Sequence, residues 1–238
     1  MYALILAGGK GERLKPLTNT VPKPMVKVMG TPIIKHQLDW LSNQGVTSVI
    51  ILCSYKWTII QNYLGDGKDV GLNIKYSVEK TPLGRGGGLR QGLAMVPKDE
   101  KSVIALNGDV ITNQPIRPLL KLHNDKNATA TLMLTRYPSA YGVLELNVSG
   151  KVTSFEEKGT LPHWIHAGVD ILERSIIDEL PELGDHETTT LPAMAKDGRL
   201  YGYKSDASWL TIDGFKDLKL AEETLQDATL RRTSQTND

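Results

Sequence analysis

The chain has 238 residues, 40% of them hydrophobic, and its 28 basic and 27 acidic side chains give a formal net charge of +1. This size suits one α/β domain with a substantial core, and the near-neutral balance argues against a nucleic-acid or membrane partner. A single cysteine excludes an intrachain disulfide, and the first apolar run is too short to span a bilayer and lacks the flanks of an export signal, so we expect a cytoplasmic protein.

The first half of the chain alternates predicted strands and helices. Apolar runs predict strands over residues 2–7, 46–53, 72–78 and 102–107, and helical spacing predicts helices over 55–64 and 87–95. A further helix is predicted between Pro32 and Gly45, with Thr31 as its N-cap. This alternation predicts an α/β fold with a Rossmann-like, mixed but mostly parallel sheet flanked by helices, and a ligand at the carboxyl ends of the strands.

The second half of the chain is richer in strands. We predict strands over residues 128–135, 143–147, 151–155, 165–172, 200–204 and 209–212, with a hairpin turn at Ser149 and Gly150. Helices are predicted over 173–180, 187–196 and from 215 to about 225, and the polar tail 229–238 is expected to fray. No linker or repeat divides the chain, so we predict a single domain over residues 1–238.

The most informative stretch follows the first strand and reads LAGGKGERL over residues 6–14, with PKP over 22–24. Its glycines, at positions 8, 9 and 11, let the backbone approach a ligand and take positive φ angles, and their amides can point at an anion. Residues 1–35 carry six basic side chains, including Arg13 and Lys23, against one acidic side chain. The stretch therefore predicts a polyphosphate site, the alternative being a glycine-rich turn with surface lysines.

Two other phosphate loops do not fit this stretch. A Walker A loop needs a Lys-Ser or Lys-Thr pair after its glycines, where this chain has Glu12 and Arg13. A dinucleotide fingerprint needs a third glycine or alanine at the position of Leu14, and no convincing ribose-binding acid follows the second strand. Both observations argue against a dehydrogenase.

Together with later motifs, this stretch resembles the sugar-1-phosphate nucleotidyltransferases, or nucleotide-sugar pyrophosphorylases, over nearly the whole chain. The family signatures LAGGxGxRL and PKP are both present in register. PLGRGG over residues 82–87 is similar to the family's P-L-G-T-A/G-G loop, LNGDV over 106–110 matches its LNGDV motif, and FEEK over 155–158 is similar to its FxEKP motif, with Gly159 in place of proline. The resemblance is closest to mannose- or heptose-1-phosphate guanylyltransferases and implies the nucleotide-diphospho-sugar transferase fold.

The resemblance implies a reaction in which the phosphate of a sugar 1-phosphate attacks the α-phosphate of a nucleoside triphosphate and releases pyrophosphate. Because the sugar phosphate is already an anionic nucleophile, the protein needs no nucleophilic side chain. It must hold two polyanions in line, which glycine amides, Arg, Lys and Mg²⁺ can do. In this reading residues 1–110 mainly bind the nucleotide, and residues 111–228 mainly bind the sugar phosphate.

The charged residues of the motifs receive roles from the same resemblance. Arg13 is expected to stabilise the triphosphate, because its planar fork matches phosphate oxygens, and Lys23, stiffened by prolines, is expected near the α-phosphate. Asp109 ends an apolar strand and is expected to hold Mg²⁺, although a turn aspartate is the plainer alternative. Relatives place a second carboxylate at the position of Thr211 or of Asp213, and we choose Asp213 because threonine carries no charge.

Base and sugar recognition are assigned to loops. Glu79 aligns with a base-reading position, and a carboxylate accepts the adjacent N–H donors of guanine, which favours GTP among the nucleotides. The alternative is a solvent-facing glutamate beside Lys80. Relatives carry Asn where this chain has His166. The expected nucleotide-binding residues are Leu6, Ala7, Gly8, Gly9, Gly11, Glu79, Pro82, Gly84, Asn107 and Asp109, and the expected sugar-phosphate-binding residues are Gly142, Glu157, Lys158, His166 and Gly168.

Several alternatives stay open at this stage. The W-x-x-x-D pattern that ends at Asp213 favours CTP, and uridylyl or thymidylyl transfer is also compatible with the motifs. A non-catalytic sensor of nucleotide-sugars is a different class of function, favoured by Thr211 and opposed by the phosphate-binding charges. Small members of this class often self-associate, so a homo-oligomer is a further expectation.

Overall fold

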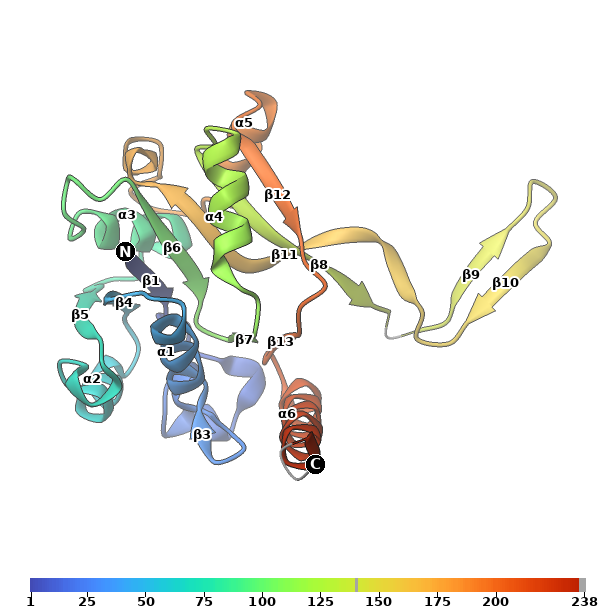
Figure 1. Ribbon diagram of the computed structural model, residues 1–238, viewed down its shortest axis with the longest axis horizontal. Coiled ribbons are helices and arrows are strands. Elements are labelled where there is room, and N and C mark those ends of the chain that lie inside the picture. The colour runs from blue at the N-terminus through green and yellow to red at the C-terminus, as the bar shows by residue number, and fades with distance from the viewer. Residues whose placement is uncertain (140, 236–238) are drawn as a thin grey trace.

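The computed structural model describes residues 1–139 and 141–235 and is built around a seven-stranded sheet (Figure 1). The strand order is β12-β8-β11-β6-β1-β4-β5, and β11 runs antiparallel to both of its neighbours while the other adjacent pairs are parallel. These strands are β1 (Tyr2–Leu6), β4 (Ser48–Cys53), β5 (Asn73–Val78), β6 (Ser102–Asn107), β8 (Ala130–Pro138), β11 (Thr160–Glu173) and β12 (Leu200–Lys204). The predicted Rossmann-like, mostly parallel sheet is confirmed.

Helices pack on both faces of this sheet. The helices are α1 (Ile33–Asn43), α2 (Trp57–Leu64), α3 (Gly84–Leu93), α4 (Ile116–Asp125), α5 (Thr190–Lys196) and α6 (Phe215–Gln235). Side chains of successive strand residues point to opposite faces. Accordingly, Ala3 and Ile5 of β1 join a core with α1, α2 and α4, whereas Leu4 joins a second core with α3 and α5. The molecule is therefore a three-layer α/β/α sandwich.

Three small strand pairs extend this sandwich. They are β2 (Lys27–Val28) with β3 (Thr31–Pro32), β7 (Val110–Thr112) with β13 (Trp209–Thr211), and β9 (Val143–Leu146) with β10 (Val152–Glu156). A third buried cluster, here called the satellite core, joins the amino-terminal loops to β7, β13 and α6. Its buried members are Leu14, Val26, Val28, Ile33, Ile111, Leu210, Ile212 and Ala221.

The predicted β9–β10 hairpin is confirmed, and it forms an arm that projects from the body of the molecule (Figure 1). The arm exposes large apolar side chains, among them Leu144, Leu146 and Phe155, the last two with 63% of their surface accessible. Across residues 1–139 and 141–235, no helix combines the length and apolar character that a membrane crossing requires.

Some predicted elements differ from the observed ones. Thr31 does not cap a helix but pairs within β3, and α1 begins after Pro32 without a side-chain cap. The helix predicted over 173–180 is a short 3₁₀ helix, Arg174–Asp178. Helix α4 was not predicted, although Ile116, Leu119 and His123 form its buried face.

The carboxyl-terminal helix is longer than predicted. Helix α6 continues to Gln235, ten residues beyond its expected end at residue 225. Residues 229–235 of the tail that was expected to fray are thus helical, and residues 236–238 lie outside the described residues.

Candidate active site

Two adjoining cavities open at the carboxyl edge of the parallel strands. In register, Leu6 of β1 lies beside Leu52 of β4 and Asn107 of β6, so the loops after these strands meet at one edge. The first cavity has a volume of about 440 Å³ and the second about 560 Å³, within the usual range for small-molecule sites. The residues that line both cavities form their shared wall, and they are Arg13, Lys23, Arg85, Asn107, Asp109 and Asp213.

The first cavity brings together all the residues predicted to bind the nucleotide. They are Leu6, Ala7, Gly8, Gly9, Gly11, Glu79, Pro82, Gly84, Asn107 and Asp109, and all of them line it. Of the three glycines in the first loop, only Gly11 has a positive φ, of 64°. The Thr18 hydroxyl donates a hydrogen bond to the Gly11 carbonyl at 2.9 Å, which fixes this turn at the mouth of the cavity.

An ionic centre occupies the shared wall. The Lys23 Nζ donates to Asp109 Oδ2 at 2.6 Å and to Asp213 Oδ1 at 2.7 Å, and Arg13 Nη2 lies 3.0 Å from the same Asp213 oxygen. The Lys23 side chain is only 14% exposed, so solvent screens its charge weakly. Burial alone would raise the pKa of Asp213, but the hydrogen bond and charge of Lys23, helped by Arg13, lower it overall. Asp213 is therefore ionised at neutral pH.

The chain builds this centre by pairing two distant segments. Strand β13 pairs with β7, so that Thr211 lies opposite Val110, and the Ile212 amide donates to the Asp109 carbonyl at 3.0 Å. This pairing places Asp213 beside Asp109, whereas Thr211 lines the second cavity only. Asp213, and not Thr211, thus joins Asp109 on the lysine.

The donor set of this centre fits a magnesium ion. Mg²⁺ binds through one or two carboxylates together with substrate phosphates. Asp109 and Asp213 each place an oxygen within hydrogen-bond distance of a single ammonium group, so both can reach one cation. Lys23 holds that place in the structure described here.

Glu79 is held in a fixed orientation in the wall of the first cavity. Its Oε2 accepts a hydrogen bond from the Leu83 amide at 3.1 Å. Its Oε1 faces Gly8 and Gly88, and a Cβ atom on Gly88 would lie only 2.6 Å from it. Glycine at position 88 therefore leaves room for the Glu79 carboxylate.

The second cavity contains two of the predicted sugar-phosphate residues, His166 and Gly168. Its aromatic wall is formed by Tyr137 and Trp209, whose rings meet edge to face at 6.3 Å. The Trp209 indole donates to the Ala167 carbonyl at 2.7 Å, which fixes the ring. Because β11 runs against the other strands, its amino-terminal half reaches the edge at which they end.

The structure does not bring the other three predicted sugar residues to either cavity. Gly142, Glu157 and Lys158 lie at the base of the β9–β10 arm. A Cβ atom on Gly142 would lie 3.4 Å from Glu157 Oε2, so these two residues are neighbours although they are remote from the cavities.

Sequence reasoning missed several lining residues, of which Arg85 is the most prominent because it lines both cavities. The available signal was its place in the PLGRGG loop, where the family pattern has threonine. The other missed residues are Glu12, Pro24, Leu52, Gly88 and Gly108 in the first cavity and Val110, Tyr137, Ile165, Ala167, Trp209 and Thr211 in the second.

Comparison with known proteins identifies the family of the chain. Residues 2–227 match the nucleotidyl transferase family. The chain belongs to this family. It is 36% identical over 215 residues to mannose-1-phosphate guanylyltransferase of Mycobacterium tuberculosis, a match that covers 87% of the chain and 59% of the relative. It is 35% identical over 227 residues to mannose-1-phosphate guanyltransferase of Pichia angusta, covering 91% of the chain and 62% of the relative. The chain thus spans about three fifths of the length of these curated relatives.

Solved structures share the fold over almost their full length. HddC from Yersinia pseudotuberculosis superposes with a TM-score of 0.76 at 27% identity, covering 94% of this chain and 99% of that one. The same protein complexed with GMP-PN superposes with a TM-score of 0.74 at 26% identity, covering 94% of this chain and 99% of that one. A putative glucose-1-phosphate thymidylyltransferase from Bacillus anthracis has a TM-score of 0.76 at 22% identity, covering 95% and 96% of the two chains.

Proposed function

We propose that the protein transfers a guanylyl group from GTP to a mannose- or heptose-type sugar 1-phosphate, giving a nucleotide-sugar and pyrophosphate. The observation that carries this proposal is the ionic centre of Lys23, Arg13, Asp109 and Asp213, because it lies in the wall between the two cavities. A triphosphate in the first cavity and a sugar phosphate in the second would meet at this wall.

In this proposal the protein acts by positioning and by charge. A phosphate oxygen of the sugar 1-phosphate forms a bond to the α-phosphorus, and the bond between that phosphorus and the oxygen bridging to the β-phosphate breaks, so its electron pair leaves with pyrophosphate. Lys23 and Arg13 offset the repulsion between the two anions and the negative charge of the transition state. Asp109 and Asp213 would hold Mg²⁺, which neutralises phosphate charge when bound.

The preference for guanine rests on Glu79. An ionised carboxylate only accepts hydrogen bonds, and guanine offers adjacent N–H donors on its Watson–Crick edge. Glu79 lines the first cavity and is oriented by the Leu83 amide. The printed names of the two curated relatives and the GMP-PN complex of the Yersinia protein support the same nucleotide.

The experiment is a matrix of GTP, CTP, UTP, dTTP and ATP against mannose 1-phosphate, a heptose 1-phosphate and other common sugar 1-phosphates, with Mg²⁺ and detection of pyrophosphate. We expect the largest kcat/KM with GTP. A preference for CTP, UTP or dTTP would show that GTP is the wrong nucleotide. If no pair released pyrophosphate, a non-catalytic sensor of nucleotide-sugars would be favoured instead.

Glu79→Gln tests the base assignment directly. Glutamine has one acceptor oxygen, which the Leu83 amide can occupy, and its NH₂ group would face the base where guanine also presents donors. We expect kcat/KM for GTP to fall roughly tenfold to a hundredfold relative to the other triphosphates, because a buried polar pair is left mismatched. An unchanged order of nucleotide preference would contradict the guanine assignment.

We also propose that the protein self-associates through the arm. A lone two-stranded hairpin is marginally stable in water, and this arm exposes Leu144, Leu146 and Phe155. Contact with a second copy would cover them, and would offer a route by which Gly142, Glu157 and Lys158 complete a sugar-phosphate pocket. Light scattering should give a dimer or larger assembly for the parent chain and a monomer for Leu146→Ser with Phe155→Ser. A monomeric parent would overturn this proposal.

A further inference from the structure

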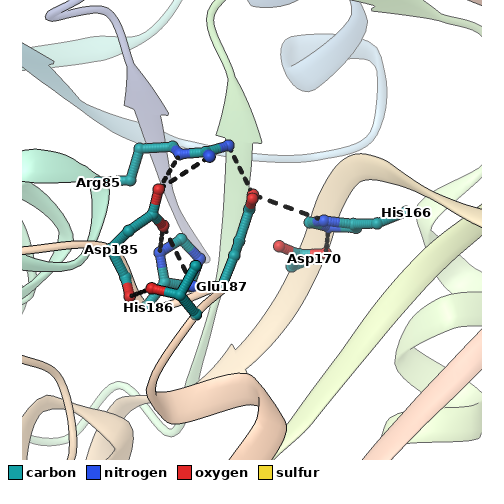
Figure 2. Close-up of polar contacts among 7 residues, drawn as sticks. Arg85, His166, Asp170, Asp185, His186 and Glu187 are labelled. Carbon is teal, nitrogen blue, oxygen red and sulfur yellow. Dashed lines mark hydrogen bonds and ion pairs between the residues drawn. The ribbon is translucent and has the colours of Figure 1, made fainter.

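A network of ion pairs lies beside the shared wall and links it to the sheet (Figure 2). Arg85 Nη1 donates to Glu187 Oε1 at 2.8 Å, and its Nε and Nη2 lie 3.0 and 2.8 Å from Asp185 Oδ2. His166 Nδ1 lies 3.7 Å from the same Glu187 oxygen, and its Nε2 is 2.8 Å from Asp170 Oδ1. We call Arg85, His166, Asp170, Asp185 and Glu187 the Arg85 network.

Close packing of the first turn of α3 fixes the position of Arg85. A Cβ atom on Gly86 would lie 2.6 Å from Pro181 Cγ, and one on Gly87 would lie 2.5 Å from the Glu182 carbonyl oxygen. The Gly86 amide donates to the Gly184 carbonyl at 2.9 Å. Only glycine permits this close approach between the first turn of α3 and residues 181–184. The approach brings the next carboxylates along the chain, Asp185 and Glu187, to the Arg85 guanidinium.

Two of the positions at which the cavity motifs depart from the family pattern meet in this network, whereas a third, Thr211, lines the second cavity outside it. Arg85 replaces the threonine of the glycine loop, and His166 replaces the asparagine that relatives carry. Glu187 contacts both of them. The departures at Arg85 and His166 are therefore connected through one carboxylate, and we treat them as one feature.

The network carries more negative than positive charge. Burial alone would lower the pKa of His166, but the Asp170 carboxylate, helped by Glu187, raises it overall. His186, which lies 3.7 Å from Asp185, has its pKa lowered by burial, and its buried Nδ1 has no hydrogen-bond partner, so it stays neutral at neutral pH. Even when His166 is protonated, three carboxylates face two cations.

Arg85 keeps hydrogen-bond donors free for a ligand. A guanidinium has five N–H donors, and Asp185 and Glu187 engage three of them. Arg85 also lines both cavities, with its side chain 46% exposed, and His166 lines the second. The spare donors suit hydroxyl oxygens, whereas the excess of carboxylates behind them repels an additional anion.

We propose, on the basis of the proposed function, that Arg85 determines the acceptor: it binds ring hydroxyls of an uncharged sugar 1-phosphate, and the surrounding carboxylates exclude sugars that carry a second acidic group. Arg85 contacts the substrate. Glu187 and His166 position it and set the local charge.

The test compares one neutral and two acidic acceptors with GTP and Mg²⁺: mannose 1-phosphate, mannose 1,6-bisphosphate and mannuronic acid 1-phosphate. We expect the parent protein to favour the neutral acceptor in kcat/KM. Glu187→Gln keeps an oxygen that accepts a hydrogen bond from Arg85 but removes the negative charge. The ratio of kcat/KM for the neutral acceptor to that for the acidic acceptors should therefore fall roughly tenfold, while KM for GTP changes little. Because Arg85 lines both cavities, Arg85→Leu should raise KM for mannose 1-phosphate by a larger factor than it raises KM for GTP.

Glu173→Gln is the matched control, because Glu173 also accepts from a histidine, His123 at 3.1 Å, and lines neither cavity. It should leave the acceptor preference unchanged. Equal use of neutral and acidic acceptors by the parent, or an unaltered ratio in Glu187→Gln, would overturn the proposal. If no pair releases pyrophosphate, the proposed reaction fails, and calorimetric binding of the three sugar phosphates to the parent and to Glu187→Gln still reports the selectivity.

Discussion

Lys23 occupies an unusual electrostatic position for a single residue. Its ammonium bridges Asp109 and Asp213 and is largely shielded from water. The same two carboxylates are the ones that would hold Mg²⁺. The lysine and the divalent ion therefore compete for the same oxygens, and the lysine would be released toward the phosphates when the ion and triphosphate arrive.

Replacing Lys23 by methionine separates these two roles. We expect Lys23→Met to lower kcat/KM by roughly 10²–10³-fold, because a cation that stabilises the transition state is lost. In the absence of nucleotide the variant should bind Mg²⁺ more tightly than the parent does, since the competing ammonium is gone. Pyrophosphate release and calorimetric titration with Mg²⁺ measure the two effects.

Lys35→Met controls for the loss of a paired lysine. Lys35 forms an i,i+4 pair with Asp39 on α1 and lines neither cavity. Exposed pairs of this kind contribute little, so both readouts should match the parent. Weaker Mg²⁺ binding by Lys23→Met would contradict the competition.

The identity of the second carboxylate shows where sequence reasoning stops. The motif around Trp209 is compatible with Thr211 and with Asp213, and we chose Asp213 for its charge alone. The pairing of β13 with β7, which joins residues about one hundred positions apart, is what places Asp213 beside Asp109. Local patterns carry no record of such a pairing, whereas the glycine loop and Asp109 could be placed because each directly follows a predicted strand.

At the scale of elements, the β7–β13 pair and the satellite core hold the ionic centre together. Ile212 precedes Asp213, and its fully buried side chain packs in the satellite core with Leu14 and Val26. In the amino-terminal loops, Arg13 directly precedes Leu14, and Lys23 lies three residues before Val26. The geometry of the charges therefore depends on apolar contacts behind them.

Ile212→Ala should weaken both the fold and the reaction. Removing this buried side chain is expected to lower the free energy of unfolding by about 2–5 kcal/mol and to misplace Asp213, so kcat should fall well below that of the parent. Leu119→Ala, at an equally buried position of α4, should cost similar stability with kcat nearly unchanged. Urea unfolding measures the loss of stability in each variant, and kcat measured at low temperature, where both variants are folded, shows whether Asp213 is misplaced. Equal kcat values would show that the satellite core does not position Asp213.

The arm shows a second limit of local patterns. The turn residues and alternating side chains predicted the hairpin, and the strands formed as expected. Its projection from the body was not predicted, because the direction of a hairpin is set by the tertiary contacts of its flanks. Gly142, Glu157 and Lys158 were assigned to the sugar pocket by family resemblance, and in the folded chain they line neither cavity.

At the scale of the whole molecule, the alternation of strands and helices predicted a mixed, mostly parallel sheet flanked by helices, and this class of fold is confirmed, although the strand order was not predicted. The insertion of β11 against its neighbours was not predicted, since nothing in its apolar run encodes direction. Yet this reversal lets His166 and Gly168 reach the edge at which β1 and β6 end.

The pH dependence of stability should carry a signature of His166. Its pKa is raised in the folded state by Asp170 and Glu187 despite burial and the opposing charge of Arg85. The stabilisation from its proton is therefore complete below the unfolded pKa, near 6.5, and is lost as pH rises through the folded pKa. The difference in free energy of unfolding between the parent and His166→Asn should shrink as pH rises from about 6.5 into the alkaline range. A difference that stays constant over this range would contradict the assignment.

The satellite core has a consequence for synthesis on the ribosome. It unites segments from the first thirty-odd residues with Ala221 of the last helix, so the frame behind Arg13, Lys23 and Asp213 closes only once that helix has emerged. During synthesis the glycine loop and Asp109 would leave the ribosome before Asp213 is available to complete the ionic centre. If the proposed reaction is the right one, unfinished chains would therefore not consume nucleotide.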